Sequence, residues 1–144
     1  MGNAQLSHSM SPSELVLARC RAFGGGNFGF IYDSYHPESY FRAQFPSRRA
    51  YLRHGASSLA ADFRIRECRI LKEQINGEEA RVLFYLDAFF RDERAESFEL
   101  SSFRMTAEGW RYHSSQKLAR REFAGEIEEI GFRDFENVQD KVFF

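Results

Sequence analysis

Two side chains in this sequence are candidates for proton transfer, the carboxyl group of Glu99 and the imidazole of His36. Burial in an apolar surrounding raises the pKa of a carboxyl group, so that it can serve as a general base, and a nearby imidazole can exchange the proton. His36 stands directly before Pro37, where a helix is expected to end, and a helix C-terminus also favours a structural imidazolium. Catalytic and structural roles are therefore both open for His36.

Glu99 has a structural alternative, which is an ion pair with Arg19 or Arg21. Both arginines belong to the first predicted helix, and a buried carboxylate without a partner is costly. We expect that one of these arginines holds Glu99, keeps it charged and lowers its pKa. A free, catalytic Glu99 with a raised pKa is the alternative.

The sequence contains no other reactive constellation. Ser101 lacks the surroundings of a nucleophile elbow, and no histidine stands at metal-ligand spacing from another ligand, so we expect neither a metal nor a cofactor. Cys20 and Cys68 are isolated, which favours two buried thiols, with a disulfide as the alternative. The three glycines at 24–26 lack the Lys-Ser/Thr of a phosphate loop and predict a turn between helices.

Helical patterns come first in the chain and strands follow. Ser11 and Glu14 form the pattern of a capping box, with Pro12 at the first helical position, and predict a helix that runs to about Phe23. The further expected segments are helical at 27–35, 38–45 and 47–54 and extended at 63–73, 80–91, 96–105 and 110–114. The strands form an antiparallel meander, and Asn76-Gly77 is its strongest hairpin signal.

The predicted strand at 80–91 has two different faces, because side chains alternate along a strand. The apolar face, which should pack on the helices, consists of Val82, Phe84, Leu86, Ala88 and Phe90. The other face is mixed and consists of Leu83, Tyr85, Asp87, Phe89 and Arg91. It is too aromatic for a bare solvent face, so we expect a homodimer through it; scattered exposed aromatic residues are the alternative.

Length and charge limit the class of protein. The 144 residues predict one domain at 11–123, a disordered N-terminus at 1–10 and an extension at 124–144, which packs on the domain or on a second subunit through residues such as Phe143 and Phe144. A net charge of -1 argues against nucleic acid, and the arginines at 48–53, 64–69 and 120–121 favour a solvated face over a nucleic-acid surface. No apolar run spans a bilayer or follows Met1, so a cytoplasmic protein without a membrane partner is expected.

Four short motifs resemble those of the YchJ-type family of bacterial proteins. The run at 19–23, Arg-Cys-Arg-Ala-Phe, and the following His36-Pro37 resemble the family's Arg-x-Arg-Tyr-x-Ala-Phe and Trp-His-Pro. The runs at 99–104, Glu-Leu-Ser-Ser-Phe-Arg, and 109–112, Gly-Trp-Arg-Tyr, resemble its Glu-x-Ser-Arg-Phe and Gly-x-Trp-Tyr-Tyr. Cys20 stands in place of the family's Tyr and Tyr35 in place of its Trp, and the cysteine-rich SEC-C zinc motifs are missing, so no zinc function is implied.

The resemblance implies an α+β fold, a cystatin-like or nuclear transport factor 2-like cone whose N-terminal helices pack on a curved antiparallel sheet of about four strands. It places Glu99 inside this cone, in a pocket expected to be lined by Tyr32, Tyr35, Phe84, Ala88, Ser101, Phe103, Trp110 and Tyr112. The family has no established activity, so we expect a small accessory or ligand-binding domain that takes a small molecule and has no catalysis. The alternative is a dehydratase- or isomerase-like enzyme in which Glu99 and His36 transfer protons.

Overall fold

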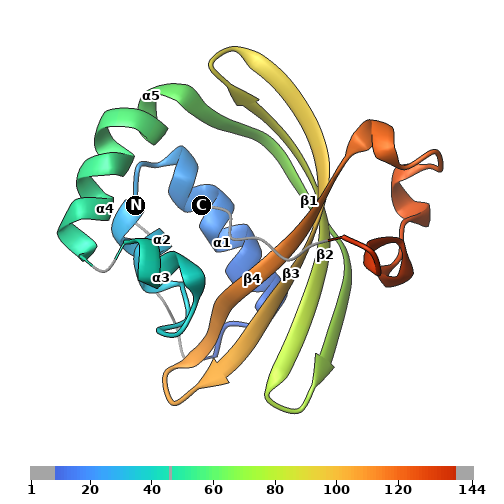
Figure 1. Ribbon diagram of the computed structural model, residues 1–144, viewed down its shortest axis with the longest axis horizontal. Coiled ribbons are helices and arrows are strands. Elements are labelled where there is room, and N and C mark those ends of the chain that lie inside the picture. The colour runs from blue at the N-terminus through green and yellow to red at the C-terminus, as the bar shows by residue number, and fades with distance from the viewer. Residues whose placement is uncertain (1–8, 46, 139–144) are drawn as a thin grey trace.

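The computed structural model describes residues 9–45 and 47–138 and shows helices followed by an open four-stranded sheet (Figure 1). The helical elements are α1 (Pro12–Gly24), α2 (Phe28–Asp33), α3 (Tyr40–Gln44), α4 (Arg48–His54), the π-helical turn η1 (Gly55–Leu59) and α5 (Ala60–Asp62). The strands are β1 (Phe63–Asn76), β2 (Glu79–Phe90), β3 (Glu93–Thr106) and β4 (Gly109–Ala119), and the 3-10 turns η2 (Arg120–Glu122), η3 (Ile127–Glu129) and η4 (Phe132–Phe135) follow. Most of the N-terminus that was predicted to be disordered, and Phe143 and Phe144, lie outside the described residues. None of the helices in the described part of the chain is long and apolar enough to cross a membrane.

The ends of α1 are those that the sequence predicts. Ser11 accepts a hydrogen bond from the Glu14 backbone N–H at 3.1 Å, and Glu14 accepts one from the Ser11 N–H at 2.8 Å, which confirms the capping box. The helix ends at the glycines, where Gly26 has a φ of 71° that favours a residue without a Cβ. This turn directs the chain into α2, so that α1 can lie along the sheet.

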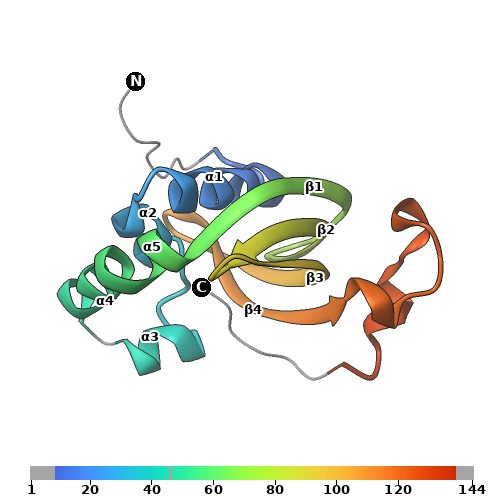
Figure 2. The same ribbon diagram turned by 90° about the horizontal axis from the view of Figure 1, so that it is seen from above.

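The sheet is an antiparallel meander in the order β1-β2-β3-β4, and it curves around α1 (Figures 1 and 2). The expected α+β cone is thus confirmed, as is the hairpin at Asn76-Gly77, where Gly77 has a φ of 66°. The last strand is longer than predicted, because β4 continues past Ser114 to Ala119 and pairs with β3 as far as Ser97. Residues 115–117 are polar, so apolar alternation did not predict this half of the strand.

The concave face of the sheet holds the main core. Val82, Phe84, Leu86 and Ala88 of β2 pack there with α1, as their alternation predicts. One end of this core is filled by aromatic rings from the helices. The ring of Tyr35 stacks on that of Phe41 with centroids 3.6 Å apart, and Tyr51 meets Phe41 edge-on at 5.0 Å. These rings close that end of the cone.

The convex face of the sheet is covered by the chain itself. Leu83 and Tyr85 of β2, together with Phe98 of β3, are buried in a second core with Ile130 and Phe135 from the C-terminal segment. Figure 1 shows this segment, η3 and η4, lying against the side of the sheet opposite to α1. The homodimer expected through this face stays a prediction, and the C-terminal segment already occupies the centre of the surface assigned to it.

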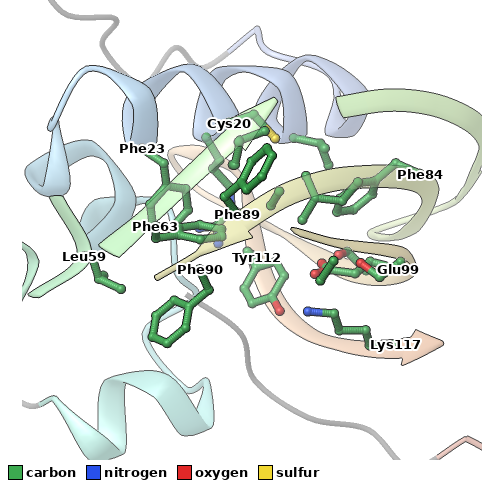
Figure 3. A pocket seen from close by; sticks show the side chains of 18 of the residues that line it. Cys20, Phe23, Leu59, Phe63, Phe84, Phe89, Phe90, Glu99, Tyr112 and Lys117 are labelled. Carbon is green, nitrogen blue, oxygen red and sulfur yellow. The ribbon is translucent and has the colours of Figure 1, made fainter. Parts of the chain in front are cut away.

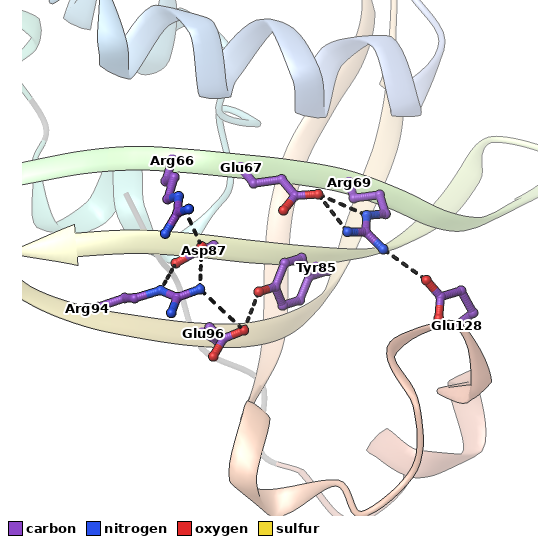
Figure 4. A network of polar contacts seen from close by, with 8 residues as sticks. All are labelled: Arg66, Glu67, Arg69, Tyr85, Asp87, Arg94, Glu96 and Glu128. Atoms are coloured by element: carbon purple, nitrogen blue, oxygen red, sulfur yellow. Dashed lines mark hydrogen bonds and ion pairs between the residues drawn. The ribbon is translucent and has the colours of Figure 1, made fainter.

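A network of charged side chains borders the second core (Figure 4). Asp87 of β2 is only 2 % exposed, and it accepts two hydrogen bonds from Arg94, at 3.0 and 2.9 Å. Arg66 approaches the same carboxylate at 3.9 Å, and these two arginines lower the pKa of Asp87 below its usual value, with the Arg94 hydrogen bonds as the main cause. On the other side of the core, Arg69 bonds Glu67 in its own strand and Glu128 of η3, which ties the C-terminal segment to β1.

We predict that Ile130→Ala destabilises the fold by about 3 kcal/mol, because it removes a fully buried side chain from the second core. The matched control is Ile75→Ala, since Ile75 is 51 % exposed on β1 and should change the free energy of unfolding by less than about 0.5 kcal/mol. Denaturant titration measures both. Equal, small effects would show that the C-terminal segment does not pack on the sheet in solution.

The lowered pKa of Asp87 predicts an acid-sensitive contribution to stability. This contribution is present above the pKa of the unfolded chain and is lost as the pH falls through the lower pKa of the folded protein. Asp87→Asn should therefore cost about 1–2 kcal/mol at pH 7, because its arginine partners are half exposed and partly screened, and should cost little near pH 2. Asp92→Asn, whose side chain is 93 % exposed, is the control and should be neutral at both pH values.

Candidate functional site

A cavity of about 270 Å³ lies between α1 and the concave face of the sheet (Figure 3). Its walls come from α1, the end of η1, the start of β1 and the inner faces of β2, β3 and β4. The residues that line it are Val16, Arg19, Cys20, Phe23, Leu59, Phe63, Ile65, Phe84, Leu86, Ala88, Phe89, Phe90, Ala95, Ser97, Glu99, Ser101, Phe103, Tyr112 and Lys117. The cavity exists because the aromatic rings of the helices fill only one end of the cone.

The two ends of the cavity differ in chemistry. Phe63, Phe89 and Phe90 gather at the end near the β2–β3 hairpin, and Phe90 is 48 % exposed, so this end is open to solvent (Figure 3). Glu99 and Lys117 lie at the other end, where the Lys117 ammonium points toward the Tyr112 hydroxyl and the Glu99 carboxyl (Figure 3). An elongated molecule could therefore place an apolar body at the open end and a polar group at the inner end.

Glu99 is the buried polar group of the cavity. It stands in the middle of β3, opposite Phe84 of β2 and Lys117 of β4, and it is 7 % exposed. No hydrogen bond or ion pair between described residues involves its carboxyl group. Burial raises the pKa of Glu99 above its usual value, and the charges of Lys117 and Arg19 only partly oppose this effect.

The ion pair that the sequence predicts between Glu99 and Arg19 or Arg21 is not formed. Arg19 is buried, and its guanidinium donates hydrogen bonds to the Ser34 hydroxyl and, at 3.3 Å, to the Tyr35 hydroxyl. It also lies over the rings of Tyr35 and Tyr112, 4.7 and 4.4 Å from their centroids. These neutral groups, and not Glu99, are the partners of the Arg19 guanidinium, and Arg21 is exposed to solvent.

The structure brings together five of the eight residues that were expected to line the pocket. Phe84, Ala88, Ser101, Phe103 and Tyr112 line the cavity. The other three lie elsewhere in the core. Tyr32 and Tyr35 belong to the aromatic rings that close the cone, and Trp110 is buried beside Met105 at the far end of β4. Bulky aromatic residues thus fill space that was predicted to belong to the pocket.

His36 does not reach Glu99 and does not line the cavity. Residues Tyr35 and His36 bridge to β4, and the His36 N–H donates to the Tyr112 carbonyl at 2.7 Å. Because Tyr35 points inward from this extended segment, His36 points away. Its imidazole faces the ring of His113 at 5.8 Å and accepts a hydrogen bond from the Glu38 N–H at Nδ1. The proton-transfer pair of Glu99 and His36 is therefore not assembled.

Several lining residues were missed for identifiable reasons. The predicted fourth strand ends at Ser114 and does not include Lys117, because the polar residues at 115–117 show no apolar alternation that would indicate an inward face. Phe63 and Phe90 lie where strands begin and end, and although Phe90 was predicted on the inward face of its strand, no sequence pattern shows that strand ends converge in space. Phe89 was assigned to the outer face, but it lies at the rim of the cavity, where both faces are near.

The thiols of Cys20 and Cys68 meet at one wall of the cavity. Both cysteines are free, and a hydrogen bond with Cys68, together with burial, raises the pKa of the Cys20 thiol well above its usual value. A thiol with a raised pKa is a poor nucleophile at neutral pH. Within residues 9–45 and 47–138, no group of three or more histidine, cysteine or acidic side chains could hold a metal ion.

The raised pKa of Glu99 leads to a prediction whose sign is opposite to that of the expected ion pair. Below the pKa of the unfolded chain Glu99 is protonated in both states and burial of its charge costs no free energy, and this cost grows as the pH rises toward the higher pKa of the folded protein. Glu99→Gln should therefore stabilise the protein at pH 7, by about 1.4 kcal/mol for each unit by which the pKa is raised, and should be neutral near pH 3.

Denaturant titration at the two pH values measures this effect. Glu93→Gln, at an exposed position of the same strand, is the control and should be neutral throughout. A loss of stability at pH 7 in Glu99→Gln would instead mean that a cation holds the carboxylate.

Comparisons with known proteins agree with this architecture. A family model described as the YchJ middle, NTF2-like domain matches residues 11–115. The solution structure of RPA3114, a SEC-C motif containing protein from Rhodopseudomonas palustris, is similar in fold, with a TM-score of 0.58 and 20 % sequence identity over 74 % of this chain and 77 % of that chain. No curated protein sequence matches the chain. The chain therefore belongs to the family of YchJ middle domains, which have the NTF2-like fold.

Proposed function

We propose that the domain binds a small, largely apolar molecule in the cavity and does not itself catalyse a reaction. The observation that supports this proposal best is the combination of an open, mostly apolar cavity with a buried carboxyl group that forms no hydrogen bond or ion pair with the described residues. Desolvation disfavours the ionised form of this carboxyl group and raises its pKa. A ligand that hydrogen-bonds Glu99 would replace the water contacts that the carboxyl group has lost.

The size of the cavity favours a small ligand. Its volume of about 270 Å³ lies just below the range that is usual for sites of drug-sized ligands, roughly 300–1,000 Å³. Taking about 30 Å³ for each water molecule of the liquid, this volume corresponds to roughly nine waters, and hence to a ligand of about ten heavy atoms. Displacing these waters from an apolar wall contributes to affinity.

A dehydratase- or isomerase-like reaction is the second candidate, and the raised pKa of Glu99 favours it. Such a reaction would use Glu99 as the only carboxyl base of the cavity, because His36 lies outside it. His36, the proton-transfer partner expected for Glu99, does not line the cavity, so we place binding first.

We predict that 1-octanol, a neutral probe of suitable size, raises the unfolding temperature of the protein. At one hundred times its Kd, a ligand that binds only the folded state stabilises it by about 2.7 kcal/mol. Ala88→Leu fills part of the cavity and should abolish this stabilisation, while Ala43→Leu, at an exposed position of α3, should retain it. Differential scanning fluorimetry measures all three proteins, and equal octanol responses in all of them would exclude the cavity as the binding site.

A further inference from the structure

Arg19 and Glu99 are buried, carry opposite charges and line the same cavity, but they do not form an ion pair. Arg19 is 8 % exposed and Glu99 is 7 % exposed, and no ion pair between described residues joins either of them to an oppositely charged side chain. The guanidinium of Arg19 has five N–H donors, and its two hydrogen bonds go to neutral hydroxyl groups. A buried arginine whose partners are all neutral is favourable to an anion that enters the same cavity.

The charged groups that face Glu99 make the inner end of the cavity positive. From α1 come Arg19 and the neutral thiol of Cys20, which bonds Cys68 of β1, and from the segment after α2 comes the neutral hydroxyl of Tyr35. From β4 come the neutral hydroxyl of Tyr112 and the ammonium of Lys117, and β2 contributes only apolar side chains. Two cations therefore act on a single carboxyl group.

We propose that the cavity takes a small monocarboxylic acid with an apolar body, whose carboxyl group lies beside Glu99 and Arg19 and whose body contacts the phenylalanines at the open end. This inference rests on the proposed binding function and names the chemical class of the ligand. The two carboxyl groups share one proton, because like charges at contact distance cannot both stay ionised in a buried site. The remaining single negative charge faces the Arg19 guanidinium, and with the Lys117 ammonium counted the occupied inner end keeps one net positive charge.

Ligands with other head groups fit this end less well. An amine would have to stay charged beside Arg19 and Lys117, and like charges that are brought together in a low dielectric repel each other strongly. An alcohol could bond Glu99, but it would leave the guanidinium without a charged acceptor. A carboxyl group satisfies both residues at once, since its oxygens accept from Arg19 and accept or share the proton of Glu99.

Proton uptake distinguishes these ligands. Where Glu99 is ionised in the free protein, binding of a carboxylate requires the uptake of one proton from solvent. The affinity for a carboxylate should then fall by about tenfold for each pH unit above the pKa of Glu99. An amine would require ionised Glu99 and would show the reverse dependence, and an alcohol would show little dependence.

The test uses octanoate, 1-octanol and octylamine, which share an alkyl chain and differ in their head group. Isothermal titration calorimetry of the full chain between pH 5 and 9, in buffers of different ionisation enthalpy, gives the Kd and the number of protons taken up. We expect octanoate to bind at least tenfold more tightly than the other two near pH 6, with uptake that approaches one proton per octanoate as the pH rises. Octanoate that binds without proton uptake, or octylamine or octanol that binds as tightly, would overturn the inference.

Glu99→Gln provides a second, independent readout. Its carboxamide can donate an N–H to a carboxylate without titrating, so octanoate should still bind, with an affinity that no longer falls with pH and no proton uptake. Glu93→Gln, exposed on the same strand, should behave as the unmodified protein. If octanol binds and Ala88→Leu blocks it, but octanoate is no better, the binding function stands and the acid specificity is wrong. If none of the three probes binds, both proposals fail.

Discussion

The structure depends on a single sheet that is buried on both faces. Along β2 the inward residues Val82 and Phe84 pack on α1, while the outward residues Leu83 and Tyr85 pack under the C-terminal segment. A sheet covered on both sides loses nearly all contact of its central strands with water, and burial of their apolar area is the main favourable term in the fold. The charged network around Asp87 and Arg69 lies at the margin of the outer core, and its ion pair between Arg69 and Glu128 joins β1 to the C-terminal segment.

The cavity follows from how the concave face is filled. A strongly curved sheet encloses more volume than one helix occupies, and the aromatic rings from α2, α3 and α4 fill the end near Tyr35. The other end receives only short or diverging side chains, such as Ala88, Ala95 and Ser97, so that space remains. The same face that holds the fold together therefore also provides a binding site, and the outer face, which the C-terminal segment covers, stabilises the sheet without filling the cavity.

The electrostatics of the cavity follow from the fact that Arg19 bonds neutral groups and not Glu99. Because Arg19 is held by Ser34, Tyr35 and the ring of Tyr112, it anchors α1 to the segment that bridges to β4. Glu99 is left with a desolvated carboxyl group whose pKa is raised, although two cations act on it. A group of this kind reduces the stability of the empty domain and favours a ligand that can share or supply a proton, which is the usual relation between a destabilised site and its function.

Much of this architecture could be predicted from local patterns in the sequence. The capping box at Ser11, the turn at Asn76-Gly77 and the alternation along β2 are short-range signals, and each gives the element that the structure shows. The inward position of Glu99 also agrees with the resemblance to the YchJ family. The partners of Glu99 and Arg19, the exclusion of Tyr32, Tyr35 and His36 from the cavity and the covering of Tyr85 were decided only by the tertiary structure. These features depend on contacts between helices and strands that are far apart in the sequence, and on how the side-chain volumes fill the concave face of a curved sheet. The periodicity of a single segment encodes neither of these.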